Sequence, residues 1–365
     1  MEPATRARED VLHWLGLVLV PGVPGEAQRA LLKAFGGARQ LAAASRESLA
    51  AIAGAAVADA LARGPDPEGV ARTLAWLEEP GHRFITLGDE DYPHALLEIH
   101  DPPTALFAMG RIELLNTPAI AVVGSRSATA QGKLDAQELA RSLADAGFCI
   151  VSGLAHGIDA AAHRGALQAR ASSIAVVGTG LDRVYPAGNR ALALELARTG
   201  AIVSEFPLGT APLPPNFPRR NRLISGLSRG VLVVEAALGS GSLITARAAL
   251  EQGREVFAMP GSIHSPVARG CHQLIREGAK LVETAEDVLV ELRTGSARVA
   301  TQPLLPGIAD PLLDALGFAP GSVDALVART HFDAGEIAAR LTALEIAGHV
   351  ARIPGGLFQR VSREA

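Results

Sequence analysis

The sequence has very few cysteines and no long uninterrupted hydrophobic run. Its two cysteines, Cys149 in an apolar run and Cys271 far along the chain, give neither a disulfide framework nor the paired spacing of a zinc site. Such sparse cysteine usage fits a reducing cytosol. We therefore expect a cytoplasmic protein that holds no metal.

The longest apolar run, Trp14 to Pro24, is about half of the roughly 20 residues that a membrane-spanning helix needs, and Gly and Pro interrupt it. A signal peptide over Val11–Val20 is the competing interpretation. Against it, Glu9 and Asp10 stand where a basic n-region belongs, and no small-residue cleavage site follows closely. We expect no membrane association.

The chain has no overall excess of positive charge, because the net charge is −4 and the sequence pI is about 6.2. This balance excludes a general polycation that coats nucleic acid, so any nucleic-acid site must be a local patch. Aromatic residues make up only 4% of the 365 residues and hydrophobic residues 48%. These values predict large aliphatic cores and room for two or three domains.

Residues 1–80 have the pattern of a series of short helices. An apolar helix over Val11–Val20 is followed by a Pro-Gly-Val-Pro-Gly turn and an amphipathic helix over Glu26–Phe35. This pattern is typical of a helix-hairpin-helix or sterile-alpha-motif-like domain, in which turn amides meet a DNA phosphate. A small helical packing or protein-interaction module fits it equally well, and both interpretations stay open.

Residues 81–292 change to strand patterns, beginning with Arg83–Leu87 and Ala105–Met109. Six continuous apolar β-runs follow, each ending in a Gly/Ser loop and a helical segment. This alternation predicts an α/β fold with a doubly wound, mostly parallel (extended Rossmann) sheet, whose ligands bind at the carboxyl ends of the strands. The six runs are Ile120–Val123, Phe148–Val151, Ser173–Val177, Ala201–Val203, Val231–Val234 and Glu255–Met259.

Residues 293–307, rich in Thr, Ser, Ala, Gly and Pro, are interpreted as a linker to a compact domain over residues 308–365. There, three helical segments precede a hairpin, which is the outline of a winged helix. Its predicted recognition helix, Ala334–Ile346, exposes a single arginine, Arg340, among glutamates. Binding in a DNA groove is therefore poorly supported, and a protein-interaction role is expected.

The stretch Phe206–Arg247 concentrates positive charge, with five arginines and one acid, Glu235. Two loops in it, rich in Gly, Ser, Asn and Pro, lead into helical patterns and supply the backbone N–H groups and helix N-termini that hold phosphate. The arginines of residues 219–222 are expected on one of these loops. Phe217, beside them, offers a flat face on which a base can stack. The pattern indicates a flexible, phosphate-rich polyanion as the ligand.

The loop Gly124-Ser125-Arg126-Ser127 lacks the Gly-x-Gly-x-x-Gly of dinucleotide-binding folds, and Gly178-Thr179-Gly180 is a lone match after the third parallel strand. A nicotinamide cofactor is therefore not expected, and nothing indicates another cofactor. Arg126, just beyond a strand and beside a helix N-terminus, can make a forked contact to phosphate. An ion pair with a local carboxylate is the structural alternative for this arginine.

Four polar residues invite a hydrolase or metal interpretation, namely Ser152, His156, Asp159 and His163. A metal would need a third well-placed ligand, and the geometry of a nucleophile cannot be seen from spacing alone. Asp159 near a helix start is also an ordinary cap. We interpret the cluster as a tight turn that shapes a loop, and expect no catalytic residue in it.

The loop after Val234 supports an enzymatic alternative, because it resembles the Pro-Gly-Gly-x-Gly-Thr-x-x-Glu loop of nucleoside-monophosphate phosphoribohydrolases. The phosphate-cradling glycines are kept, but the catalytic glutamate of that family falls on Thr245. A phosphate cradle without its carboxylate points to binding rather than to glycosidic cleavage. We therefore expect a binding protein and not an enzyme.

Five motifs of the chain, several of them discussed above, carry a family resemblance: Gly124-Ser125-Arg126, Ser152-Gly153-x-Ala155-x-Gly157-Ile158-Asp159, Thr179-Gly180-Leu181-Asp182-x-x-Tyr185-Pro186-x-x-Asn189, Phe217-Pro218-x-Arg220-Asn221-Arg222-x-Ile224-Ser225-Gly226-Leu227-Ser228 and Ser240-Gly241-Ser242-Leu243-Ile244-Thr245-Ala246. Together they closely resemble the DNA-processing protein A (DprA/Smf) family. The resemblance implies an extended Rossmann domain that binds and protects single-stranded DNA during natural transformation, forms a homodimer and helps to load RecA in recombination. The helical and winged-helix-like flanks fit the same family.

The resemblance also implies roles for residues. Arg126 is expected to contact a phosphate, Phe217 a base, and Arg220 and Arg222 the strand, while Ser240–Ser242 form a backbone cradle. The full set of predicted DNA-binding residues is Gly124, Ser125, Arg126, Phe217, Arg219, Arg220, Asn221, Arg222, Ser240, Gly241, Ser242 and Thr245.

The chain departs from the family at one position. Some relatives have a lysine shortly before the Phe-Pro pair, where this chain has Pro214-Pro215. Part of the family's positive charge is therefore missing here, and Arg219 is a candidate to compensate for it.

Overall fold

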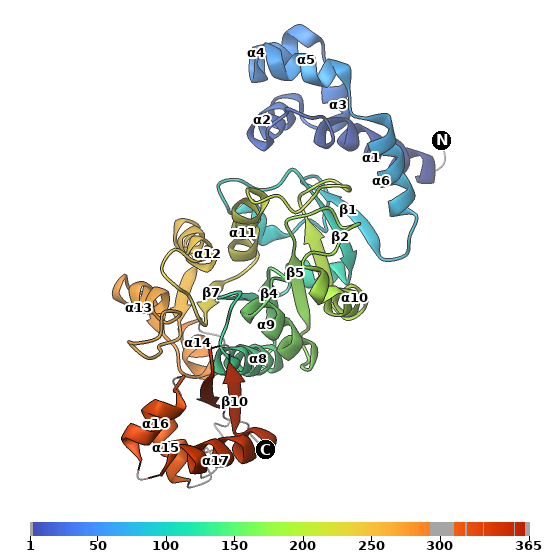
Figure 1. Ribbon diagram of the computed structural model, residues 1–365. Helices are drawn as coiled ribbons and strands as arrows, with labels where there is room; N and C mark the ends of the chain where they lie inside the picture. Colours follow the sequence, from blue (N-terminus) through green and yellow to red (C-terminus); the bar gives the residue numbers. More distant parts are fainter. Residues whose placement is uncertain (1–2, 293–309, 318–319, 331, 354, 362–365) are drawn as a thin grey trace.

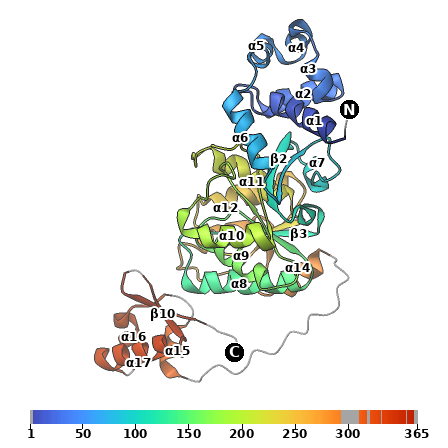
Figure 2. The same ribbon diagram turned by 90° about the vertical axis from the view of Figure 1, so that its right-hand side faces the viewer.

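The computed structural model describes residues 3–292, 310–317, 320–330, 332–353 and 355–361 (Figures 1 and 2). Helices come first along the chain, a large sheet with helices follows, and a small unit of three helices and a hairpin comes last. The predicted linker over residues 293–307 lies outside the described residues. Among the residues that are described, no helix is both long and apolar enough to cross a membrane.

Six helices make up the N-terminal unit, and the predicted pair of helices is present as α1 and α2. Local caps encode where helices start: the Ser45 hydroxyl accepts from the N–H of Ser48 in α4, and Asp66 caps α6 ahead of Pro67. Buried aliphatic side chains, Leu31 among them, pack between the helices. The helices are α1 (Pro3–Val18), α2 (Gly25–Phe35), α3 (Ala38–Ala42), α4 (Arg46–Ala53), α5 (Ala55–Arg63) and α6 (Pro67–Leu77).

A nine-stranded sheet forms the centre of the chain, in the order β1-β2-β6-β5-β4-β3-β7-β8-β9. The six predicted apolar runs are the strands β3 to β8, which run parallel, and the two earlier runs are the antiparallel strands β1 and β2. This confirms the doubly wound, mostly parallel sheet, to which the short strand β9 adds an edge that the sequence analysis missed. The strands are β1 (His82–Thr86), β2 (Ala105–Gly110), β3 (Ala119–Val123), β4 (Cys149–Ser152), β5 (Ser173–Val176), β6 (Ala201–Ser204), β7 (Gly230–Val233), β8 (Glu255–Ala258) and β9 (Lys280–Leu281).

The strand order reverses between β3 and β7. From β3 the chain winds outward through β4, β5 and β6, and then crosses back to β7, which pairs with β3 on the other side. The loops that leave the carboxyl ends of these two neighbouring strands therefore diverge. A doubly wound sheet binds its ligand in the crevice at this switch point.

Helices cover both faces of the sheet (Figure 2). The helices on each face pack their apolar side chains against the strand residues that point to that face. The strands are therefore apolar on both faces. On one face lie α8 (Ala130–Asp145), α9 (Ile158–Leu167), α10 (Arg190–Thr199) and α14 (Ala285–Glu291), and on the other lie α11 (Asn216–Gly226), α12 (Gly241–Glu251) and α13 (Arg269–Arg276). The shorter elements are α7 (His94–Leu97), η1 (Ile112–Asn116) and η2 (Ala187–Asn189).

One expectation about this region was wrong. The arginines of residues 219–222 were assigned to a loop, whereas they lie on the helix α11. Pro218 hides the helix in the sequence, but proline is tolerated in a first turn, where its missing N–H has no helical partner. Arg220 also obscures the pattern, because it takes a buried position in line with Leu223 and Ile224.

The C-terminal unit has the predicted winged-helix arrangement. Its helices enclose a small aliphatic core that includes Leu313, Leu326, Ile337 and Leu341. The guanidinium of Arg340, the single arginine of the predicted recognition helix, is half-buried and pairs with Glu336. The elements are α15 (Pro311–Leu316), α16 (Val323–Arg329), α17 (Ala334–Ile346) and the antiparallel pair β10 (Val350–Ile353) and β11 (Leu357–Arg360).

Candidate nucleic-acid interface

A cavity of about 780 Å³ opens at the switch point between β3 and β7. Ten of the twelve residues predicted to bind DNA line it, and they come from four segments of the chain: the loop after β3, the start of α11, the loop after β7 and the start of α12. The ten are Gly124, Ser125, Arg126, Phe217, Arg220, Asn221, Ser240, Gly241, Ser242 and Thr245. The other two, Arg219 and Arg222, line a different cleft.

The loop after β3 is held tightly against its neighbours. A Cβ atom at Gly124 would come within 2.8 Å of the carbonyl oxygen of Glu235 and 2.6 Å of the Ile158 side chain, so only glycine fits. The N–H of Ser125 donates to the same Glu235 oxygen over 2.7 Å. These contacts fix the position of Arg126, which follows directly and whose side chain is exposed.

Arg126 lies beside the ring of Phe217, which in turn packs against the ring of Tyr185. Its guanidinium carbon is 5.5 Å from the centre of the Phe217 ring, and the ring of Tyr185 lies 5.5 Å from that of Phe217 at a tilt of 35°. Within the part of the chain that the structure describes, Arg126 forms no ion pair. The ion-pair alternative for Arg126 therefore finds no partner among the described residues, and its contact with a phosphate stays a prediction.

Tyr185 was missing from the predicted set, although it lines the same cavity and is 44% exposed. It follows β5, and its contact with Phe217 depends on the arrival of α11 from a distant part of the sequence. One signal was available, since this is one of only two tyrosines in the chain and it stands directly before a proline. We refer to Arg126, Tyr185 and Phe217 together as the aromatic platform.

The N-terminus of α12 forms another wall of the cavity. The hydroxyl of Ser240 caps this helix by accepting from the N–H of Ser242 over 3.3 Å, and the two hydroxyls lie 2.8 Å apart. The side chain of Asn221 donates to the carbonyl oxygen of Gly241 over 3.3 Å, which ties α11 to α12. The positive end of the helix dipole is thus presented to the cavity, as the predicted phosphate cradle requires.

Arg220 lies in the floor of the cavity and is nearly fully buried. Its Nη1 donates to the carbonyl oxygens of Gly153, over 2.8 Å, and Val176. Burial lowers the pKa of the Arg220 guanidinium to about 10, which leaves it charged at neutral pH. Burial raises the pKa of the nearby Asp159 carboxyl, although Arg220 opposes this shift. Contact between Arg220 and a DNA strand stays a prediction, because the hydrogen bonds described for Nη1 are donated to backbone carbonyl oxygens of the protein itself.

Three of the four residues that invited a catalytic interpretation have structural partners, and among them Asp159 accepts from the N–H groups of Gly153 and Ala155. The Ser152 hydroxyl donates to the carbonyl oxygen of Val122, and the His163 ring lies 2.7 Å from the Ser173 hydroxyl. Burial lowers the pKa of His163 to about 3, so its ring is neutral at physiological pH. Among the described residues, no three His, Cys, Asp or Glu side chains are placed to hold a metal ion.

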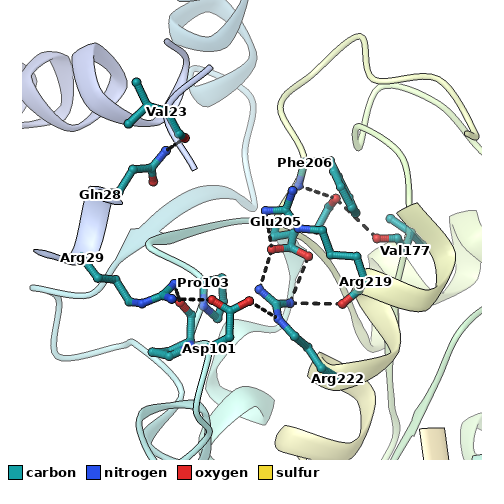
Figure 3. Close-up of polar contacts among 12 residues, drawn as sticks. Val23, Gln28, Arg29, Asp101, Pro103, Val177, Glu205, Phe206, Arg219 and Arg222 are labelled. Atoms are coloured by element: carbon teal, nitrogen blue, oxygen red, sulfur yellow. Dashed lines mark hydrogen bonds and ion pairs between the residues drawn. The ribbon is translucent and has the colours of Figure 1, made fainter. Parts of the chain in front are cut away.

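Arg222 and Arg219 line the other cleft, where both bond to Glu205 (Figure 3). Arg222 donates two hydrogen bonds to Glu205, of 3.0 and 2.8 Å, and one of 2.9 Å to Asp101. Arg219 donates one hydrogen bond of 3.2 Å to Glu205. The acid-poor stretch Phe206–Arg247 therefore has its counter-ions just outside it, one of them the residue immediately before.

The fold and this interface define a class of proteins with an extended Rossmann sheet that can hold phosphates at its switch point. Within that class, residues 83–293 match the profile of the DNA recombination-mediator protein A family, and residues 296–356 match the DprA winged helix domain. The chain belongs to the DNA recombination-mediator protein A family. The family is named for a mediator role, which agrees with the expectation of a protein that is not an enzyme.

Named relatives cover most of the chain. It is 45% identical to Protein Smf of Escherichia coli K12 over 300 residues, which are 79% of this chain and 80% of that protein. It is 50% identical over 203 residues to DNA processing protein DprA of Streptococcus pneumoniae, covering 56% of this chain and 72% of the relative.

Two solved structures share the fold. The structure of DprA from Streptococcus pneumoniae has a TM-score of 0.68 and 39% identity, and the match covers 76% of this chain and 96% of that one. A structure that describes the single-stranded DNA binding mode of DNA processing protein A from Helicobacter pylori has a TM-score of 0.54 and 32% identity, covering 59% and 98%.

Proposed function

We propose that the protein binds single-stranded DNA without strong sequence preference in the cavity at the switch point and protects the strand there. The observation that carries this proposal is the aromatic platform beside the N-terminus of α12. In it an exposed arginine, which has no carboxylate partner among the described residues, lies over the Phe217 ring, and that ring packs against Tyr185. The single-stranded DNA binding mode described for the Helicobacter pylori relative supports it.

The platform suits a single strand better than a duplex. Every base has a flat π-face, so an aromatic ring can stack on any unpaired base, whereas a duplex keeps those faces covered. An arginine fork and helix-terminal N–H groups bind the phosphate backbone, which is the same in every sequence. The combination gives affinity with little base discrimination.

The recombination role extends beyond DNA binding. The family's recombination-mediator description supports a role in recombination. We propose that the protein acts in the cytoplasm during natural transformation, as a homodimer that promotes assembly of RecA on the bound strand. RecA assembly on strands coated with single-strand-binding protein measures this step. If the protein fails to stimulate assembly, the RecA role is wrong while the DNA-binding proposal stands.

Binding of matched single-stranded and double-stranded oligonucleotides tests the central proposal. We expect the single strand to bind more tightly, with similar affinity for different base compositions. An assay for nucleoside-monophosphate hydrolysis belongs beside it, and no turnover is expected because Thr245 stands where the hydrolases have glutamate. Equal or tighter binding of the duplex would reject the single-strand assignment.

A further inference from the structure

A second cleft, of about 850 Å³, lies where the N-terminal unit meets α11. One side consists of α2 residues, including Arg29 and Lys33, and the other includes Arg219. The cleft is adjacent to the cavity along the chain, because Pro218 lines the cavity and the next residue lines the cleft. The first turn of α11 therefore separates the cavity from the cleft.

A chain of alternating charges runs across the cleft (Figure 3). Arg29 pairs with Asp101 at 2.5 Å, and its Nη1 also donates to the carbonyl oxygen of Pro102 over 2.9 Å. Asp101 in turn pairs with Arg222, which shares Glu205 with Arg219. Three guanidinium groups thus face two carboxylates, which leaves one positive charge in excess.

The excess charge resides at the Arg219 end. The Arg222 side chain is 16% exposed and is fixed by its bonds to both carboxylates, whereas Arg219 is 56% exposed and donates a single bond to Glu205. Because Arg222 donates two bonds to Glu205, this buried carboxylate keeps a partner when Arg219 moves away. Arg219 can therefore turn to a ligand at little cost, and Arg222 cannot.

Lys33 supplies a second cation on the opposite side of the cleft. It is exposed, and among the described residues it forms no ion pair. The charged side chains that line the cleft are four cations, Arg29, Lys33, Arg219 and Arg222, and three anions, Glu26, Asp101 and Glu205. The cleft is thus net positive by one charge in a chain whose net charge is −4.

We propose that the cleft is a second phosphate subsite, in which a strand that leaves the cavity crosses the first turn of α11 and places a backbone phosphate between Arg219 and Lys33. This inference rests on the proposed function. It makes the N-terminal unit a direct part of the DNA-binding surface, and it assigns to Arg219 the phosphate contact that Arg220 and Arg222, both committed to protein partners, are poorly placed to make.

Strand length tests the proposal, because a short strand fills the cavity alone and a longer strand reaches the cleft. Affinity and its salt dependence are measured with oligothymidylates of about 4 and about 16 nucleotides, the range of single-strand site sizes. Each lost phosphate contact flattens the log–log salt slope by about 0.7 on single strands. We expect Arg219→Ala and Lys33→Ala each to flatten the slope by this amount on the long strand only.

The control variants separate a phosphate contact from diffuse charge. Arg39→Ala removes an exposed cation from the same N-terminal unit outside the cleft and is expected to leave both slopes unchanged. Arg126→Ala should flatten the slope on both strands. Slopes that stay unchanged on the long strand in Arg219→Ala and Lys33→Ala would overturn the second subsite, and so would equal flattening on the two strands, while the proposed function would stand. If the wild type binds neither strand, the proposed function fails and the second subsite fails with it.

Discussion

The guanidinium of Arg126 lies over the ring of Phe217, with 5.5 Å between its carbon and the ring centre. One residue follows β3 and the other begins α11, so the sheet topology brings them together. The cation–π attraction orients the arginine without using its N–H groups on a carboxylate. A DNA strand at this place would meet an aromatic ring on which a base can stack and, beside it, N–H groups that can donate hydrogen bonds to a phosphate.

Replacement of Phe217 by alanine should weaken binding of single-stranded DNA by about 1 to 3 kcal/mol, because it removes the ring on which a base stacks. Phe217→Tyr keeps a ring and should retain most of the affinity. Tyr185→Ala should lose affinity as well, since its ring extends the same platform. Fluorescence anisotropy of a labelled oligonucleotide measures all three, and unchanged affinity in Phe217→Ala would remove Phe217 from the site.

The contact made by Arg126 can be distinguished from a diffuse positive field. Arg126→Ala should flatten the log–log salt slope by about 0.7 and lower affinity with little dependence on base sequence. Arg126→Lys keeps the charge but loses the fork, so a substantial loss of affinity in this variant indicates a bidentate contact. Titrations at several salt concentrations give the slopes. If Arg126→Ala has the wild-type slope, the strand binds elsewhere.

Most of the sheet could be predicted from the sequence. Each parallel strand is buried on both faces, so Ile120–Val123 and its counterparts are continuous apolar runs. Each run is followed by a glycine-rich loop, which marks its end. The edge strand β9 was missed because it is only two residues long and both of them, Lys280 and Leu281, are exposed. Helix α11 was missed because a buried arginine takes the position of an apolar residue.

The residues of the candidate site could be predicted where each of them lies in a loop that follows one strand. Gly124 and Ser240 each lie in a loop that follows one strand, and the loops on the two sides of a switch point border the same crevice. Pairing between distant segments was not predictable. The bond from Arg222 to Asp101 joins residues far apart in the sequence, and no pattern around either residue indicates the other. Charge counted along a stretch therefore overestimated the charge available to a ligand.

Arg220→Ala should destabilise the protein by about 3 to 5 kcal/mol, since it removes a buried guanidinium and leaves Asp159 and two carbonyl oxygens without it. The matched control is Arg126→Ala, an exposed change whose effect on stability should stay within about 0.5 kcal/mol. Urea denaturation of both variants checks the difference. A stable Arg220→Ala variant with a flattened salt slope would instead show that Arg220 contacts the strand.

The last prediction concerns Glu235, whose carboxylate accepts from the N–H and the hydroxyl of Thr129 and lies against Gly132. Burial raises the pKa of the Glu235 carboxyl, and the bonds from Thr129 and the charge of Lys133 only partly oppose this. The folded state therefore holds the proton more firmly than the unfolded chain does. The contribution of the Glu235 carboxyl to the free energy of unfolding is therefore fully present below the unfolded-state pKa. It is lost as the pH rises through the raised pKa of the folded state.

Glu235→Gln removes this titration and keeps an oxygen that can accept from Thr129. The variant should therefore gain stability relative to the wild type as the pH rises from about 4, the ordinary glutamate value, to neutrality. Glu113→Gln is the matched control with the opposite sign, because a hydrogen bond from Arg111 lowers the pKa of the Glu113 carboxyl. That carboxylate contributes stability above its unfolded pKa, so its loss should cost a small amount at neutral pH. Thermal midpoints of the three proteins across this pH range decide the matter: a constant difference between Glu235→Gln and the wild type would show that Glu235 titrates alike in the folded and unfolded chain.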